Sequence, residues 1–359
     1  MNEQQLLAAY AEGDRAFHNL DLPAGKLIGI HFNQATFNDS NFAQGIFTRS
    51  DFSYCYFYGA DLTEASLYGT NLSYAKLDQA NLLRANLTKA NLQGASFRHA
   101  NLKQAQLSGA ILTWVSFFRA QLQQVNFKGA NLRGINLRGA NLTGADLSWT
   151  NLSEAKLSGA ILDKVNLNGA RFHGAYLNAL DFSGRDFSGL GLTAVKFNGG
   201  KCNDSILIGA NLTGSQLRLT EFIKTNFKKA CLNDCNFLGA NLSRANCEQV
   251  EAIAATFTEA NLRQSNFSAA NLQGANFSGA DLRGANFWGA NLEGANFWGA
   301  NLEGANFIGA DLTSACFDDA NLAGTILKPS PTAPLATSQL LSLFDLIPQP
   351  NLTKTWFVS

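Results

Sequence analysis

The sequence predicts an all-β protein whose chain winds as a closed coil with short, straight sides. Three observations support this prediction. Every fifth residue from Leu27 to Leu327 is leucine or phenylalanine, with only three exceptions and no insertion that shifts the phase. Around each of these central residues, alanine is typical two positions before, and asparagine or aspartate one position before. Glycine is frequent two positions after the centre, as at Gly139, Gly274 and Gly299.

A period of five residues does not fit an α-helix. At about 100° per residue, five residues rotate the chain about 140° away from any one face, so no apolar stripe persists. In an extended segment, residues two apart share a face, and the small residue and the centre therefore point inward together. The next small residue lies three positions on, which is an odd step, so the chain must bend once in every repeat. Glycine after the centre favours that bend.

The repeat Ala-(Asn/Asp)-(Leu/Phe)-X-X over residues 27–327 resembles that of the pentapeptide-repeat family, and Ala290 to Gly299 contains it twice. The resemblance implies a right-handed, quadrilateral parallel β-helix with four repeats, about 20 residues, in each coil. At a rise of about 4.8 Å per coil, about fifteen coils would form a rod about 70 Å long. Residues 20 apart would then stack, so Phe257, Phe277 and Phe297 are expected to form an aromatic column that helps to fill the interior.

The two ends depart from the repeat and define three predicted segments. They are 1–26, an N-terminal helical cap and lead-in; 27–328, the β-helix; and 329–359, a proline-containing linker with a C-terminal helical cap or tail. Within the first segment, residues 2–16 are expected to form a short helix, with Asn2 as N-cap and Leu6, Leu7 and Tyr10 as its apolar face. The C-terminal segment either caps the last coil or docks to a partner or a second copy, and a homodimer could form through a coil end or through this tail.

The zero net charge conceals an uneven charge distribution. Between Asp78 and Asp146 there are eight basic residues and no acidic one, whereas residues 248–319 contain nine acidic residues against two basic. The register places Arg98, Arg119 and Arg138 on one face of consecutive coils. Two further bases lie on the adjoining face and complete what we call the basic corner: Arg84 and Lys103.

The basic corner has two interpretations. Either it contacts an acidic protein, a nucleic acid or an anionic lipid headgroup, or its side chains are simply solvated, as outward positions ordinarily are. No aromatic residue is expected between the arginines, so sequence-specific recognition of nucleic acid is not predicted.

Two other surface features stand out. Trp288 and Trp298 directly follow their centres and should point outward on opposite faces, either as a contact surface or beneath the C-terminal tail. Leu180, Arg185 and Leu190 fill positions usually given to small residues. A bulge, bend or widened coil is expected there, as a structural irregularity or as a partner site.

No catalytic, cofactor-binding or metal-binding constellation is apparent. The four histidines are scattered, and the six cysteines occupy ordinary repeat positions and are expected to be reduced thiols. Cys231 and Cys235 should point in different directions, so zinc binding is not expected despite their spacing. The polar start of the chain and the lack of a long apolar run predict a cytoplasmic protein.

We therefore expect a non-enzymatic structural or interaction protein, a rigid rod-like scaffold that binds another macromolecule, most simply a protein, through its outer faces. The segment Leu7 to Phe17 resembles the N-terminal segment of many cyanobacterial family members, but this resemblance does not indicate a specific role. One alternative comes from a branch of the family that mimics DNA and binds DNA gyrase through a long acidic face; the neutral total and the basic band depart from it. A further alternative is binding of nucleic acid or an anionic membrane, whose affinity would collapse between low and moderate salt.

Overall fold

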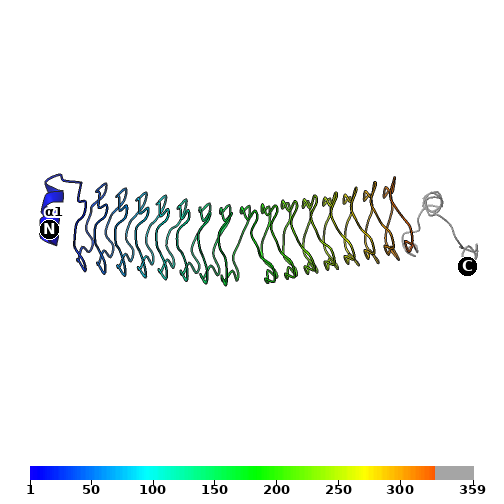
Figure 1. Cartoon of the computed structure of the whole chain (residues 1–359), viewed down its shortest axis with the longest axis horizontal. Helices are drawn as coiled ribbons and strands as arrows, with labels where there is room; N and C mark the ends of the chain where they lie inside the picture. The colour runs from blue at the N-terminus through cyan, green and yellow to red at the C-terminus, as the bar shows by residue number, and fades with distance from the viewer. Residues whose placement is uncertain (328–359) are drawn as a thin grey trace, which may run out of the picture. The chain divides into compact units, whose positions relative to one another are not determined.

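The computed structural model describes residues 1–327, in two compact units: unit 1, Met1–Leu180, and unit 2, Asp181–Ser359 (Figure 1). Among the described residues there is one helix, α1 (Glu3–Ala11), and the rest of the chain forms isolated parallel β-bridges joined by turns. No helix in this range has the length and apolar character required to cross a bilayer. The predicted linker and C-terminal helical segment, 329–359, lie outside the described residues.

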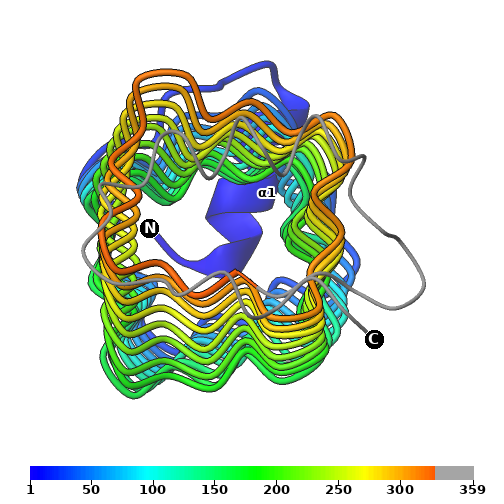
Figure 2. The ribbon, with the colours of Figure 1, turned by 90° about the vertical axis from the view of Figure 1, so that its right-hand side faces the viewer.

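Each β-bridge pairs the residue before one centre with the residue 20 positions later. In unit 1, for example, Asn71 pairs with Asn91, and in unit 2 Asn271 pairs with Asn291. With five residues to a side, this spacing gives a four-sided coil, which Figure 2 shows in a view along the coils. The predicted parallel pairing and quadrilateral coil are therefore confirmed. Pairing begins at Ala16, earlier than the predicted boundary at residue 27.

The corner of each coil is a β-turn that follows the centre. The N–H of Ala275 donates to the carbonyl of Leu272 at 3.0 Å and closes such a turn. Its third residue, Gly274, has φ 66°, and non-glycine residues at the same position are also left-handed, for example Trp114 with φ 59°. A type II turn requires a positive φ at its third residue, and one such turn after each centre directs the chain onto the next side of the coil. This is the bend that the period of five predicts.

Stacked aromatic rings fill part of the interior of unit 2. The ring centroids of Phe257 and Phe277 are 4.9 Å apart with planes 5° from parallel, and those of Phe277 and Phe297 are 5.0 Å apart at 4°. The Phe287 ring meets Phe297 edge-on at 5.9 Å. All four side chains are completely buried. The expected aromatic column is confirmed, and it places the core inside the coils and leaves the outward positions free for recognition.

Local hydrogen bonds define both ends of α1. The Asn2 side chain accepts from the Gln5 N–H at 3.0 Å, and the Gln5 side chain accepts from the Asn2 N–H at 2.9 Å, which is a capping box. At the other end, the N–H of Asp14 donates to Ala9 and Gly13 adopts φ 109°. This is the geometry of a Schellman motif, in which glycine terminates a helix. The helix therefore ends at Ala11 and not at residue 16 as predicted.

Helix α1 covers the open end of the first coil, as Figure 2 shows. Leu6 is completely buried, and the Tyr10 ring meets the Phe32 ring edge-on at 4.8 Å. The Tyr10 hydroxyl also donates to the Asn33 carbonyl at 3.0 Å. Leu7, predicted on the apolar face, is 41% exposed, because it follows Leu6 and points about 100° away around the helix. The N-terminal helix thus protects an aromatic core that an open coil would expose.

The predicted irregular stretch begins where unit 1 ends. Leu180 is buried, whereas Arg185 and Leu190 are half-buried. In unit 2, the pairings from Asp181 to Lys201 and onward keep the 20-residue spacing. These pairings do not test the predicted bulge, bend or widened coil, which stays a prediction.

Candidate functional site

The basic corner is formed by outward positions of unit 1. Arg98, Arg119 and Arg138 are exposed and follow the buried centres of three consecutive coils, which the β-bridges before those centres stack directly. Among residues 1–327, no ion pair involves these three arginines. Asp78, one coil before Arg98, accepts from the Arg98 backbone N–H at 3.0 Å and not from its guanidinium group. Three guanidinium groups without an ion pair therefore share one side of unit 1.

An aromatic ring lies between two of these arginines. The guanidinium carbons of Arg98 and Arg119 are 5.6 and 5.2 Å from the centroid of the Phe118 ring, and the His99 ring meets it edge-on at 5.7 Å. Cations within about 6 Å of a ring centroid are attracted by its quadrupole. The expectation that no aromatic residue separates the arginines is wrong. Phe118 occupies the outward position one coil before Arg138, so the register could have located it.

The bases of the adjoining side contribute less. Arg84 pairs with Glu64 at 3.1 Å and donates to Gln104 at 3.1 Å. Hydrogen bonds from the side chains of Gln44 and Arg84 hold the pKa of Glu64 below its ordinary value, so Glu64 stays ionised and offsets the charge of Arg84. Lys103 is half-buried. The exposed positive charge of the predicted corner is therefore concentrated at Arg98, Arg119 and Arg138.

Large aromatic side chains are also exposed outside the basic corner. In unit 2, Trp288 and Trp298 are 55% and 54% exposed, as the register predicts for outward positions. In unit 1, Trp114 and Trp149 are 65% and 67% exposed, and sequence reasoning missed both. They stand two positions after their centres, where glycine is frequent, and this position was the signal that could have found them.

The six cysteine side chains differ in burial. Cys231 is partly exposed whereas Cys235 is buried, which agrees with the expectation that they point apart. Within residues 1–327, no group of three or more histidine, cysteine, aspartate and glutamate residues is placed to hold a metal ion. Burial raises the pKa of Cys55 and Cys235 to about 12 and that of two more thiols even further. The buried thiols are Cys55, Cys202, Cys235 and Cys247.

The parallel coils and the outward position of these side chains define a solenoid repeat protein. Two family models match the sequence. The model for pentapeptide repeats matches 8 copies within residues 120–159, 150–189 and 290–328, and the model for the pentapeptide repeat region matches 45–127 and 230–307. Together they cover well over half of the chain, which therefore belongs to the pentapeptide-repeat family.

Several solved structures are similar to this chain. HetL, a pentapeptide-repeat protein involved in heterocyst differentiation regulation in Nostoc sp. strain PCC 7120, is 25% identical over 91% of this chain and 97% of HetL, with a TM-score of 0.25. Rfr23 from Cyanothece 51142 is 24% identical over 45% of this chain and 97% of Rfr23, with a TM-score of 0.20. Full-length QnrB1, a plasmid-mediated fluoroquinolone resistance protein, is 17% identical over 44% and 93%, with a TM-score of 0.24. A search of curated proteins gave no match.

Proposed function

We propose that this chain is a non-enzymatic interaction protein that binds an acidic protein partner through the basic corner of unit 1. One observation carries the proposal: Arg98 and Arg119 flank the Phe118 ring on consecutive coils and have no ion pair among the described residues. Arginine and aromatic side chains are enriched in protein interfaces and dominate their energetic hot spots. Such a surface suits carboxylates that lie next to an apolar contact.

The size of this surface favours a protein over a nucleic acid or a membrane. Two neighbouring bases are already paired, Arg84 with Glu64 and Arg133 with Glu154 at 2.8 Å. Nucleic-acid binding proteins that depend on charge make about 6–10 phosphate contacts, and membrane-binding clusters contain about 4–8 basic residues. With Arg84 paired, the corner retains four bases, which is fewer than the phosphate contacts of a charge-dependent nucleic-acid binder and only the lower limit for a membrane-binding cluster.

Gyrase binding by DNA mimicry requires a long acidic face, which the acidic residues of unit 2 do not supply. Glu259, Glu293 and Glu303 follow centres that are not a multiple of 20 residues apart, so they project from three different sides. Glu248 is paired with Lys228 at 2.9 Å. The acidic residues of the described part of unit 2 are thus dispersed, and this observation gives the DNA-mimic alternative no support.

Five expectations stay predictions beside this proposal. They concern the right hand of the coils and their number, about fifteen; the boundary at residue 328; an irregular coil at Leu180, Arg185 and Leu190; a cap, docking or dimer contact by residues 329–359; and a cytoplasmic location.

The proposal is tested by affinity capture from the native host, followed by mass spectrometry. The corner variant carries Arg98→Glu, Arg119→Glu and Arg138→Glu. The matched control reverses three exposed bases on another side of unit 1: Arg49, Lys89 and Lys128. Both variants must retain the wild-type circular dichroism spectrum and thermal stability.

A partner that is captured by the wild type and the control, but at least about tenfold less by the corner variant, supports the proposal. Equal loss with both variants would show only a dependence on net charge. Equal capture by all three proteins would remove the basic corner from consideration.

A further inference from the structure

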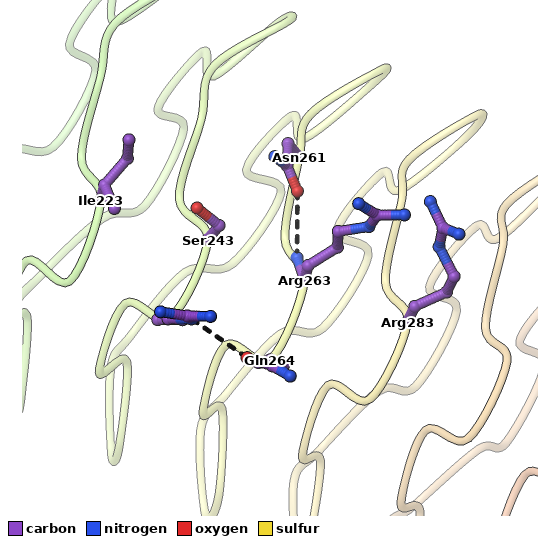
Figure 3. A pocket seen from close by; sticks show the side chains of 7 residues that line it. Ile223, Ser243, Asn261, Arg263, Gln264 and Arg283 are labelled. Carbon is purple, nitrogen blue, oxygen red and sulfur yellow. Dashed lines mark hydrogen bonds between the residues drawn. The ribbon is translucent and has the colours of Figure 1, made fainter.

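A groove of about 450 Å³ lies on one side of unit 2 and has no role in the proposed function (Figure 3). Four of its residues, Ile223, Ser243, Arg263 and Arg283, follow centres 20 positions apart and therefore stack along consecutive coils. Ser243 is the shortest of the four and lies between Ile223 and Arg263. The short side chain between longer ones accounts for the hollow.

A single carboxylate holds two of the arginines in place. Asp281 forms an ion pair with Arg263, whose Nε lies 2.9 Å from Asp281 Oδ2, and it accepts hydrogen bonds from Arg283 Nε at 2.9 Å and Nη2 at 2.7 Å. Figure 3 shows the guanidinium groups of Arg263 and Arg283 extending beside each other from adjacent coils. One carboxylate balances one guanidinium, so this arrangement retains a net positive charge. Both groups are also oriented before any ligand arrives, which reduces the entropy lost on binding.

A third arginine lines the groove from the neighbouring column. Arg244 Nε donates to Gln264 Oε1 at 3.1 Å, and Arg244 has no ion pair among residues 1–327. The three guanidinium groups of the groove and the carboxylate of Asp281 therefore leave two positive charges. Ser243 and Asn261 add neutral polar groups to the same lining.

We propose that this groove binds a small molecule that carries a phosphate group. A phosphomonoester is close to doubly negative at neutral pH, which matches the two uncompensated charges. Planar guanidinium groups donate paired hydrogen bonds to phosphate oxygens, and Arg263 and Arg283 each keep donors that Asp281 does not occupy. The volume lies within the range of about 300–1,000 Å³ that is usual for small-molecule sites. Ile223 supplies an apolar wall for the organic part of the ligand.

Isothermal titration calorimetry tests this site directly. The full-length chain is titrated with inorganic phosphate, with glucose 6-phosphate and, as the phosphate-free counterpart, with glucose. The groove variants are Arg263→Gln and Arg283→Gln, and Arg283→Lys keeps the charge while removing the fork. The matched control is Arg218→Gln, which removes one exposed positive charge from another side of unit 2.

The expected result is binding of both phosphate compounds and not of glucose. Each Arg→Gln variant should raise the dissociation constant at least about tenfold, because a charged hydrogen-bond donor is lost, and Arg218→Gln should leave it unchanged. The lysine variant should fall between the wild type and the glutamine variant.

Three results would overturn the proposal. One is a lack of heat with either phosphate compound at concentrations up to about 10 mM. Another is equal weakening by Arg218→Gln, which would indicate a general charge effect. The third is binding of a single-stranded oligonucleotide when neither small phosphate binds, which would assign the groove to a macromolecule. None of these variants touches unit 1, so the test is independent of the basic corner.

Discussion

Truncating one ring of the aromatic column should destabilise unit 2 strongly. Phe277 is completely buried, and its ring is stacked between those of Phe257 at 4.9 Å and Phe297 at 5.0 Å. It also meets the Phe287 ring edge-on at 5.8 Å. We expect Phe277→Ala to lower the free energy of unfolding because it removes these contacts and leaves a cavity that the neighbouring coils cannot close.

The magnitude follows from the packing. A buried Phe→Ala substitution costs about 3–5 kcal/mol, and each aromatic pair contributes about 0.5–1.5 kcal/mol beyond its buried area. The stacked position therefore places Phe277→Ala at about 4–5 kcal/mol. Phe277→Leu should cost only about 1.5 kcal/mol. Leucine already occupies the same side of another coil of unit 2, where Leu217 is completely buried.

The assay is urea denaturation followed by far-ultraviolet circular dichroism and by tryptophan fluorescence, with coincident transitions as the test of two-state behaviour. The leucine variant separates loss of volume from loss of aromatic character. A cost for Phe277→Ala below about 2 kcal/mol, or one equal to that of Phe277→Leu, would refute the close packing of the column.

Three further predictions concern the turns, the thiols and one carboxylate. Gly294 has φ 66° and nothing within 4 Å of an added Cβ, so Gly294→Ala should cost about 1 kcal/mol in urea denaturation through backbone strain alone. At pH 8, Cys231 and Cys316 should be alkylated in the native protein, and the four buried thiols only after unfolding, as peptide mass mapping would show. Hydrogen bonds from Ser183 hold the pKa of Asp181 below its ordinary value. The ionised carboxylate therefore stabilises the fold above the unfolded-state pKa of Asp181, and this stabilisation is lost as the pH falls through the folded-state pKa. Ser183→Ala should raise that pKa, which carboxyl NMR titration would measure, and an unchanged pKa would contradict the assignment.

The inward half of the structure was predictable because the interior imposes one period on the chain. The stacking of Phe277 on its neighbours and the outward placement of Trp288 and Trp298 both follow from the five-residue repeat and the 20-residue coil. The end of α1 was less predictable. The backbone of Gly13 stops the helix near Ala11, whereas apolar spacing alone suggested a longer one.

The outward half was harder to predict because charges must be compared across coils and not along the chain. The segment between Asp78 and Asp146 contains no acidic residue, yet two of its basic side chains form ion pairs with carboxylates from outside the segment. Glu64 reaches Arg84 from the preceding coil, and Glu154 reaches Arg133 from the following coil. A count of charges along the sequence treats all eight bases of this segment as equivalent.

The same rule joins the two surfaces that remain positive. The charge of a basic side chain stays uncompensated where no carboxylate of the preceding or following coil reaches it, and this holds for Arg119. Beside Arg98, the Asp78 carboxylate accepts from the backbone N–H and not from the guanidinium group. In the groove of unit 2, one carboxylate is shared between Arg263 and Arg283, so it orients both and neutralises only one of the two charges. Positive charge held on a stacked, well-packed backbone is what an incoming anion would find already in place. Recognition by this fold should therefore depend on the columns of outward residues, and substitutions within one column should interact while those on different sides act independently.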